Sequence, residues 1–317
     1  MSGFINIVYT VIGYSENYAK CVEFFVKSLL IYTPYPLFDI FVLCDEKLID
    51  QVKHIIRDAL VTCTPLQRNT IGEHLRFAPL PHTPTPMRAS MQKLRLFDIE
   101  NVFDYKYALY VDLDIMCLTN LNRLFIAYDD YLLRNPDQKN KLQACPERET
   151  VEGHNEIFWS MNNYTKENLA FFSKHNILPF NAGCFLFPLS PAFKNYFREI
   201  LQMIVDTRSQ GKLFFYEQAY MNVYFNTRNL ISYDMINCEN YVMFPDADTP
   251  YTDKIVHFCG SPGQALIKYD MMSAYAQKHN VFIPKNKNKG SYEKRTRVCP
   301  SLLQTFSLCI INVSIKL

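Results

Sequence analysis

The chain has 317 residues and a formal net charge of +2; 49% of its residues are hydrophobic and 20% are charged. This length accommodates one large α/β domain or two modest ones, and the composition is that of a globular protein with ample core. Because positive and negative charges nearly cancel, the sequence argues against a nucleic acid or another polyanion as a partner.

Strands and helices are predicted to alternate along the first third of the chain. Apolar runs predict strands over residues 4–12 and 37–44, and helical periodicity predicts helices over 16–32 and 46–60. Four prolines then form a stiff connection to a helix that begins near residue 87 and ends near 97. This alternation implies right-handed crossovers and a mostly parallel, mixed central sheet flanked by helices, an α/β fold.

Two aspartates directly follow the next predicted strand, the apolar run Tyr107–Val111. Asp112 and Asp114 are separated only by Leu113, and in extended backbone such side chains point to the same side. Two carboxylates held that close are costly unless a positive charge lies between them. The sequence therefore predicts a Mg²⁺ or Mn²⁺ site, with a diphosphate as companion, beyond the carboxyl end of this strand.

The rest of the chain has weaker patterns. Residues 146–178 are polar and weakly periodic, which predicts a loop near the site, and a strand around Leu186 comes next. Helices are expected over 191–208 and 216–225, followed by a short strand over 254–258. No internal repeat or clear second domain is evident, so the sequence predicts a single domain.

This domain is predicted to cover residues 1–284, and residues 285–317 form a basic and then apolar tail. The tail is expected to pack on the domain, with a membrane-surface anchor as the alternative. Residues 4–12 are interpreted as a strand and not as a secretory leader. The ten cysteines include no CxxC pair, which favours buried thiols in a reducing compartment over a zinc site. We therefore expect a cytoplasmic protein.

Several short motifs occur in a fixed order along the chain. They are Tyr9-Thr10 with Tyr14 and Tyr18; Lys93; Asp112-Leu113-Asp114; Asn181-Ala182-Gly183; Glu217-Gln218; and His257-Phe258-Cys259-Gly260. In this order they resemble the pattern of glycosyltransferase family 8, the family of glycogenin and bacterial lipopolysaccharide galactosyltransferases. The resemblance implies a GT-A nucleotide-sugar fold. It also implies transfer of a hexose from a nucleotide diphosphate, usually UDP, to an acceptor hydroxyl with retention of configuration.

The resemblance assigns roles at the diphosphate. Asp112, Asp114 and His257 would hold Mn²⁺, with Mg²⁺ as the alternative, and the nitrogen ligand favours Mn²⁺. The metal would neutralise the departing diphosphate, and Lys93 would add a positive charge nearby.

The remaining motif residues are assigned to the sugar and the nucleoside. Asn181 and Gln218 would lie against the donor sugar, and Glu217, where the family often has Asp, would orient sugar hydroxyls. Thr10, Tyr14 and Tyr18 would cradle the base and ribose. The other residues assigned to the donor site are Leu113, Ala182, Gly183 and Gly260.

Two departures from the family pattern leave alternatives open. The family often carries a Lys-Pro-Trp run after the last motif, but here the next lysine is Lys268. Either Lys268 substitutes for the missing lysine or the diphosphate is held less tightly. Ala182 stands where the family often has Ser. The alternative function is a nucleotide-sugar-binding or interaction module of the same fold without turnover.

Other interpretations of the same residues compete with this resemblance. A haloacid-dehalogenase-type phosphatase also uses two aspartates, but on its first strand, whereas two strands precede Asp112 here. Taken singly, His257 could be a hydrogen-bonded strand residue and Gln218 or Lys93 a helix-surface residue. The acceptor, whether glycan, glycolipid, polyol or protein, is not indicated by any segment.

Overall fold

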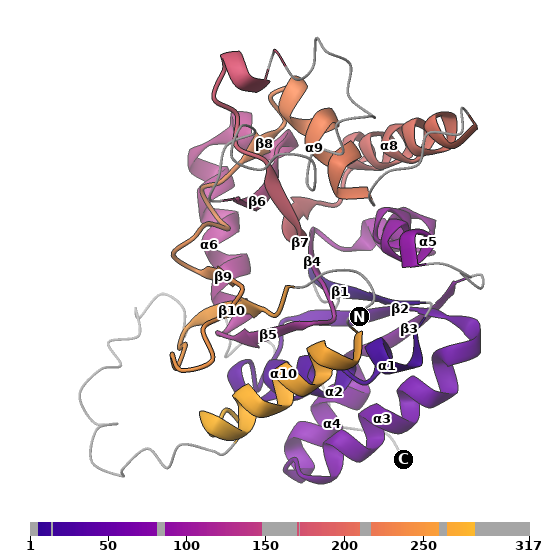
Figure 1. Cartoon of the computed structure of the whole chain (residues 1–317), viewed down its shortest axis with the longest axis vertical. Helices are drawn as coiled ribbons and strands as arrows, with labels where there is room; N and C mark the ends of the chain where they lie inside the picture. The colour runs from indigo at the N-terminus through magenta and orange to yellow at the C-terminus, as the bar shows by residue number, and fades with distance from the viewer. Residues whose placement is uncertain are drawn as a thin grey trace, which may run out of the picture. The chain divides into compact units, whose positions relative to one another are not determined.

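A seven-stranded sheet forms the centre of the molecule (Figure 1), and its strand order is β3-β2-β1-β4-β7-β6-β8. Neighbouring strands from β3 to β4 are parallel, as are β6 and β8, whereas β7 runs antiparallel to both β4 and β6. The strands are β1 (Asn6–Ile12), β2 (Phe38–Asp45), β3 (Leu75–Leu80), β4 (Tyr107–Val111), β6 (Leu142–Pro146), β7 (Phe180–Pro188) and β8 (Ile231–Ser232). The predicted mostly parallel, mixed sheet is confirmed.

The computed structural model describes most of the chain up to residue 282, which belongs to one compact unit. The described residues are 6–13, 15–80, 86–147, 170, 172–209, 217–259 and 265–282. Tyr14, Gly260, most of the predicted loop over 146–178 and the tail over 285–317 lie outside them. Among the described helices, none is long and apolar enough to cross a membrane.

A second, three-stranded sheet continues from the end of β4. It consists of β5 (Ile115–Leu118), β10 (Lys254–His257) and β9 (Tyr241–Met243), in the order β5-β10-β9. β10 is antiparallel to β5, and this register sets His257 opposite Ile115, the residue after Asp114. The second sheet thereby brings residues near position 257 to the two aspartates.

Helices cover both faces of the central sheet (Figure 1), and each face has its own apolar core. Residues of α2, α3, α6 and α10 pack in one core, and residues of α8, α9 and a 3₁₀ segment in the other. The helices are α1 (Glu16–Ala19), α2 (Val22–Tyr32), α3 (Ile49–Val61), α4 (Pro65–His74), α5 (Pro86–Met91), α6 (Leu121–Arg134), α8 (Pro191–Ser209), α9 (Glu217–Thr227) and α10 (Ala265–Lys278). The 3₁₀ segments are Glu46–Leu48, Gln92–Asp98, Val102–Asp104 and Pro136–Asn140. With both faces covered, β1 and β2 are buried along their whole length.

Some predicted boundaries were wrong. The helix expected over 16–32 is divided into α1 and α2, and the one expected from residue 87 becomes a 3₁₀ helix from Gln92 onward. The first of the four prolines expected to form the connection, Pro79, belongs instead to β3. β3 is an edge strand, the position in a sheet where a proline is tolerated. The strand predicted around Leu186 begins earlier than expected, because β7 already includes Asn181, Ala182 and Gly183.

Candidate functional site

The two aspartates lie in the short turn between β4 and β5, and the backbone of this turn is fixed from two sides. The Asp112 N–H donates to the Gly183 carbonyl oxygen over 2.7 Å, which ties the turn to β7. The Phe258 N–H donates to the Asp114 carbonyl oxygen over 2.9 Å, which ties it to the end of β10. Because both partners belong to predicted motifs, the fold brings three motifs into one place.

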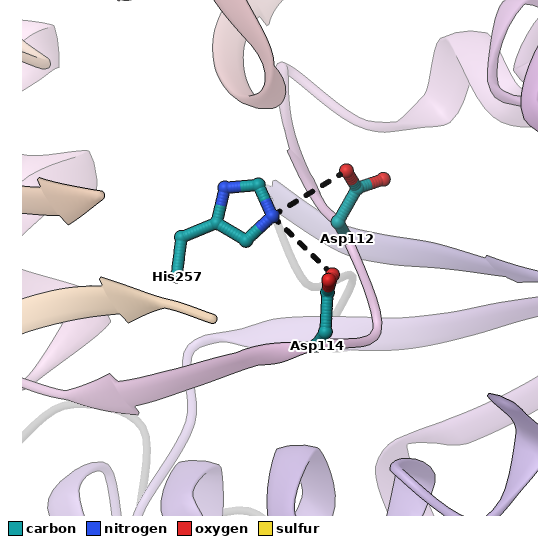
Figure 2. A group of neighbouring side chains, drawn as sticks. All are labelled: Asp112, Asp114 and His257. Carbon is teal, nitrogen blue, oxygen red and sulfur yellow. Dashed lines mark ion pairs between the residues drawn. The ribbon is translucent and has the colours of Figure 1, made fainter. Parts of the chain in front are cut away.

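His257 completes a cluster with the two carboxylates. Its Nε2 lies 3.3 Å from Asp114 Oδ1 and 3.8 Å from Asp112 Oδ2. Figure 2 shows that both ion pairs leave this one ring nitrogen, while the other nitrogen points away. One ligand atom from each residue lies within 4.8 Å of the others. Asp114 and His257 are buried, whereas the Asp112 side chain is 25% exposed, so solvent reaches the cluster at Asp112.

Gly183 leaves the space in which this cluster fits. A Cβ at this position would lie 2.4 Å from His257 Cε1, 2.8 Å from Asn181 Oδ1 and 2.9 Å from Asp112 Oδ2. All three distances are shorter than real Cβ contacts. Any side chain at 183 would therefore displace a group of the site.

Two lysines lie against the carboxylates. Lys93 Nζ is 3.3 Å from Asp112 Oδ1 and 2.7 Å from Glu217 Oε1, and it donates to the Ala182 carbonyl oxygen over 3.0 Å. Lys268 Nζ, from α10, donates to Asp114 Oδ2. The lysine predicted as a substitute for the family's diphosphate lysine therefore reaches the acid pair.

The pKa values reflect this concentration of charge. Burial alone would raise the pKa of Asp114, but the charges of Lys268 and His257 and their hydrogen bonds hold it well below its usual range. Burial would lower the pKa of His257, yet the neighbouring Cys259 and Asp114 raise it well above its usual value. Burial would likewise lower the pKa of Lys93, but Asp112 and Glu217 raise it. The site therefore favours the ionised form of the acid and of both bases.

A second group of polar side chains lies beside Lys93. Gln218 Oε1 accepts from the Ala182 N–H over 3.0 Å, and Asn181 Nδ2 donates to Glu147 Oε1 over 3.1 Å. Within the described part of the chain, Glu217 Oε2 and Thr10 Oγ1 are among the buried side-chain oxygens that have no hydrogen-bond partner. Unsatisfied buried acceptors are costly, and an incoming ligand with hydroxyl groups would satisfy them.

The remaining residues assigned to the donor differ in their relation to the acid pair. The Tyr18 hydroxyl donates to Asp114 Oδ1 over 3.0 Å, so in this structure it contacts the acid pair. The Leu113 side chain is fully buried in the core, which leaves only its backbone for ligand contacts. The predicted Tyr14 and Gly260 lie outside the described residues.

Sequence reasoning missed three residues that contact the site. The Tyr110 hydroxyl donates to Asp112 Oδ1, and its position near the end of β4, two residues before Asp112, could have indicated this. Glu147 accepts from Asn181, and Tyr241 bonds both Asn181 and His257. No short-range pattern points to Glu147 or Tyr241, because their partners are distant in the sequence.

The donor set fits a divalent cation of the Mg²⁺ and Mn²⁺ type. Two carboxylates and one imidazole nitrogen converge on one point, and Gly183 keeps that point free of a side chain. Hard oxygen ligands suit both ions, and the imidazole favours Mn²⁺. The two lysines beside the carboxylates would attract an anionic ligand to the same point.

Comparison with known protein families identifies the family of this chain. The model of glycosyl transferase family 8 matches residues 9–262. The chain therefore belongs to glycosyl transferase family 8 and is a glycosyltransferase. No curated protein sequence matches the chain significantly.

Two similar solved structures are of the galactosyltransferase LgtC. One is LgtC in complex with donor and acceptor sugar analogues; it is 17% identical, with a TM-score of 0.51 over 86% of this chain and 95% of that chain. The other is an active-site mutant of LgtC in which glutamine is replaced by glutamate; it is 16% identical, with a TM-score of 0.53 over the same shares. At this identity the likeness concerns the fold, and it confirms the expected GT-A architecture.

Proposed function

We propose that this enzyme transfers a hexose from a nucleotide-diphosphate sugar, with UDP as the expected nucleotide, and that it depends on a divalent metal. Asp112, Asp114 and His257 would hold Mn²⁺, with Mg²⁺ as the alternative. The observation that carries the proposal is the convergence of these three side chains on one point beside two lysines. When bound, the metal supplies Lewis-acid stabilisation of the diphosphate leaving group.

Lys268 is proposed as the second cation for the diphosphate. In this structure its Nζ compensates the charge of Asp114. With a divalent cation held at Asp114, Lys268 would pair with a phosphate oxygen of the donor. Lys93 keeps its three partners, Asp112, Glu217 and the Ala182 carbonyl, and so would hold the sugar-binding residues in place.

Asn181, Glu217 and Gln218 are proposed to act at the sugar. The unpartnered Glu217 Oε2 and Thr10 Oγ1 could each accept a hydroxyl hydrogen of the donor. Gln218 is oriented by the Ala182 N–H, and a glutamine is the residue altered in the LgtC active-site mutant. A neutral amide is a poor nucleophile, so we favour a front-side displacement with retention over a covalent intermediate.

The alternative, a binding or interaction module without turnover, rested on the missing diphosphate lysine. The contact between Lys268 and Asp114 supports the active enzyme instead. For the acceptor we propose a glycan, because LgtC was crystallised with an acceptor sugar analogue. A glycolipid, a polyol and a protein remain the other candidates.

We also propose that residues 1–284 form the catalytic domain and residues 285–317 a tail. Peripheral membrane contact is the alternative role of the tail. A cytoplasmic location is supported by the eight cysteines within the described residues, all of which are free thiols.

The proposed function is tested by incubating the protein with UDP-glucose, UDP-galactose, UDP-N-acetylglucosamine and GDP-mannose, each with Mn²⁺, Mg²⁺ or EDTA. Release of the nucleotide is measured with and without simple sugar acceptors. We expect release from one UDP-sugar with Mn²⁺ and none with EDTA, and proton NMR of the product should show the anomeric configuration of the donor. Donor binding without any release would favour the inactive module, and no binding of any donor would refute the proposal.

A further inference from the structure

The orientation of His257 is set by a chain of hydrogen bonds that begins at the backbone. The Gly183 N–H, which can only donate, bonds Asn181 Oδ1 over 2.8 Å. This contact identifies that atom of Asn181 as the carbonyl oxygen, and the amide nitrogen then donates to Glu147 Oε1. Both contacts agree on one orientation of the Asn181 amide.

The same Asn181 oxygen lies 2.9 Å from the Tyr241 hydroxyl. Because a carbonyl oxygen has no hydrogen to give, the single hydroxyl hydrogen of Tyr241 must point to Asn181. The Tyr241 oxygen also lies 2.5 Å from His257 Nδ1. With its hydrogen already used, this oxygen can only accept, so Nδ1 must carry a hydrogen.

We propose that Tyr241 is a positioning residue that fixes His257 in the form protonated at Nδ1, so that the Nε2 lone pair is presented to the metal. This inference rests on the proposed metal-dependent function. Nε2 is the nitrogen that faces both aspartates, and Nδ1 points away from them (Figure 2). Metal-bound histidines commonly donate their other N–H to a neighbouring oxygen, which fixes the tautomer and the ring orientation.

The fold supports this role for Tyr241. Tyr241 opens β9 and His257 ends β10, and the two strands are neighbours that pair in parallel. Tyr241 and Asn181 are both buried, so water does not readily replace either partner. Asn181 belongs to β7 of the central sheet, and the chain of bonds therefore links both sheets at the site.

Calorimetric titration of Mn²⁺ into the metal-free, full-length enzyme tests this inference. Tyr241→Phe removes the acceptor for Nδ1 and keeps the ring, and we expect Mn²⁺ affinity to fall about tenfold or more. The matched control is Tyr107→Phe, which removes the hydroxyl of another buried tyrosine; its partner, at 2.6 Å, is Asp129. The control should bind Mn²⁺ as the wild type does. Wild-type affinity in a folded Tyr241→Phe variant would overturn the proposal.

A second measurement needs no folded variant of Tyr241. Nitrogen-15 NMR of histidine-labelled, metal-free wild type reports the tautomer once the pH is high enough that the His257 signal stops shifting. Absence of the signal from a His257→Ala sample assigns it. We expect the hydrogen on Nδ1, and a hydrogen on Nε2 would overturn the inference. If the wild type binds no Mn²⁺, the proposed metal dependence fails, while the tautomer still decides the role of Tyr241.

Discussion

Replacement of Gly183 by alanine should disable metal binding through a single added methyl group. The new Cβ would lie 2.4 Å from His257 Cε1, whereas ordinary contacts begin at 3.4 Å. The imidazole would therefore have to retreat by about 1 Å, and metal-ligand distances tolerate only about 0.2 Å. Asp112 Oδ2, 2.9 Å from the new carbon, would be displaced as well.

The structure thus predicts the loss of at least one metal ligand in Gly183→Ala. Mn²⁺ affinity measured by calorimetry should fall at least about tenfold, the scale of effects seen for groups that merely orient a ligand. Overpacking should also reduce the free energy of unfolding by about 1–3 kcal/mol. Both measurements are made on the metal-free protein, so that metal binding does not itself contribute to stability.

Gly72→Ala is the matched control. Gly72 lies in α4, and a Cβ there would meet nothing within 4 Å. Because glycine inside a helix costs about 0.5–1 kcal/mol relative to alanine, this variant should be slightly more stable and bind Mn²⁺ normally. If folded Gly183→Ala binds Mn²⁺ as tightly as Gly72→Ala, then the cluster of Asp112, Asp114 and His257 is not the metal site.

Three further predictions concern the neighbouring residues. Gln218→Ala should slow transfer far more than it weakens UDP binding, because its proposed role is at the sugar; equal losses of both would contradict that role. Lys268→Met should weaken UDP binding about tenfold in the presence of Mn²⁺, because a charged hydrogen bond to phosphate is lost, but it should not weaken the binding of Mn²⁺. Unchanged UDP affinity in titrations would contradict the proposed role of Lys268 at the diphosphate. The pKa of His257 is raised well above its usual value of about 6.5, so protons compete with the metal for this side chain even above that pH. Mn²⁺ affinity should therefore increase from about pH 6 to about pH 9. In the metal-free protein the sign is opposite: the stabilisation by charged His257 is complete below the unfolded-state pKa and is lost as pH rises through the folded value. If the Mn²⁺ affinity and the free energy of unfolding both stay constant over this pH range, the charged state of His257 inferred from its ion pairs is contradicted.

Local patterns predicted the parts of the site that are close in sequence. The apolar run before Asp112 indicated a buried strand, and the spacing of the two aspartates indicated that their carboxylates converge. The alternation of strands and helices indicated the parallel half of the sheet. The edge strand β3 was missed because Pro79 is atypical of strands, although an edge position tolerates it.

Long-range register explains what the sequence could not provide. His257 reaches the aspartates because β10 pairs with β5, a strand some 140 residues earlier in the chain. The resemblance to family 8, and not any local pattern, identified His257 as a ligand. Tyr241 and Glu147 have no motif, and only the assembled fold places them next to Asn181. The sequence also could not show that Lys268 lies at the site; this follows from the position of α10, which brings Lys268 Nζ to Asp114.

The central claim is that nucleotide binding depends on a metal held by the acid pair, and calorimetry of UDP binding tests it most directly. UDP is titrated into wild type and Asp114→Asn, each with Mn²⁺ or with EDTA, after circular dichroism has established that the variant is folded. We predict binding to the wild type only with Mn²⁺, and none to Asp114→Asn under either condition. Equal UDP affinity in Mn²⁺ and EDTA, or unchanged affinity in the folded variant, would contradict the account.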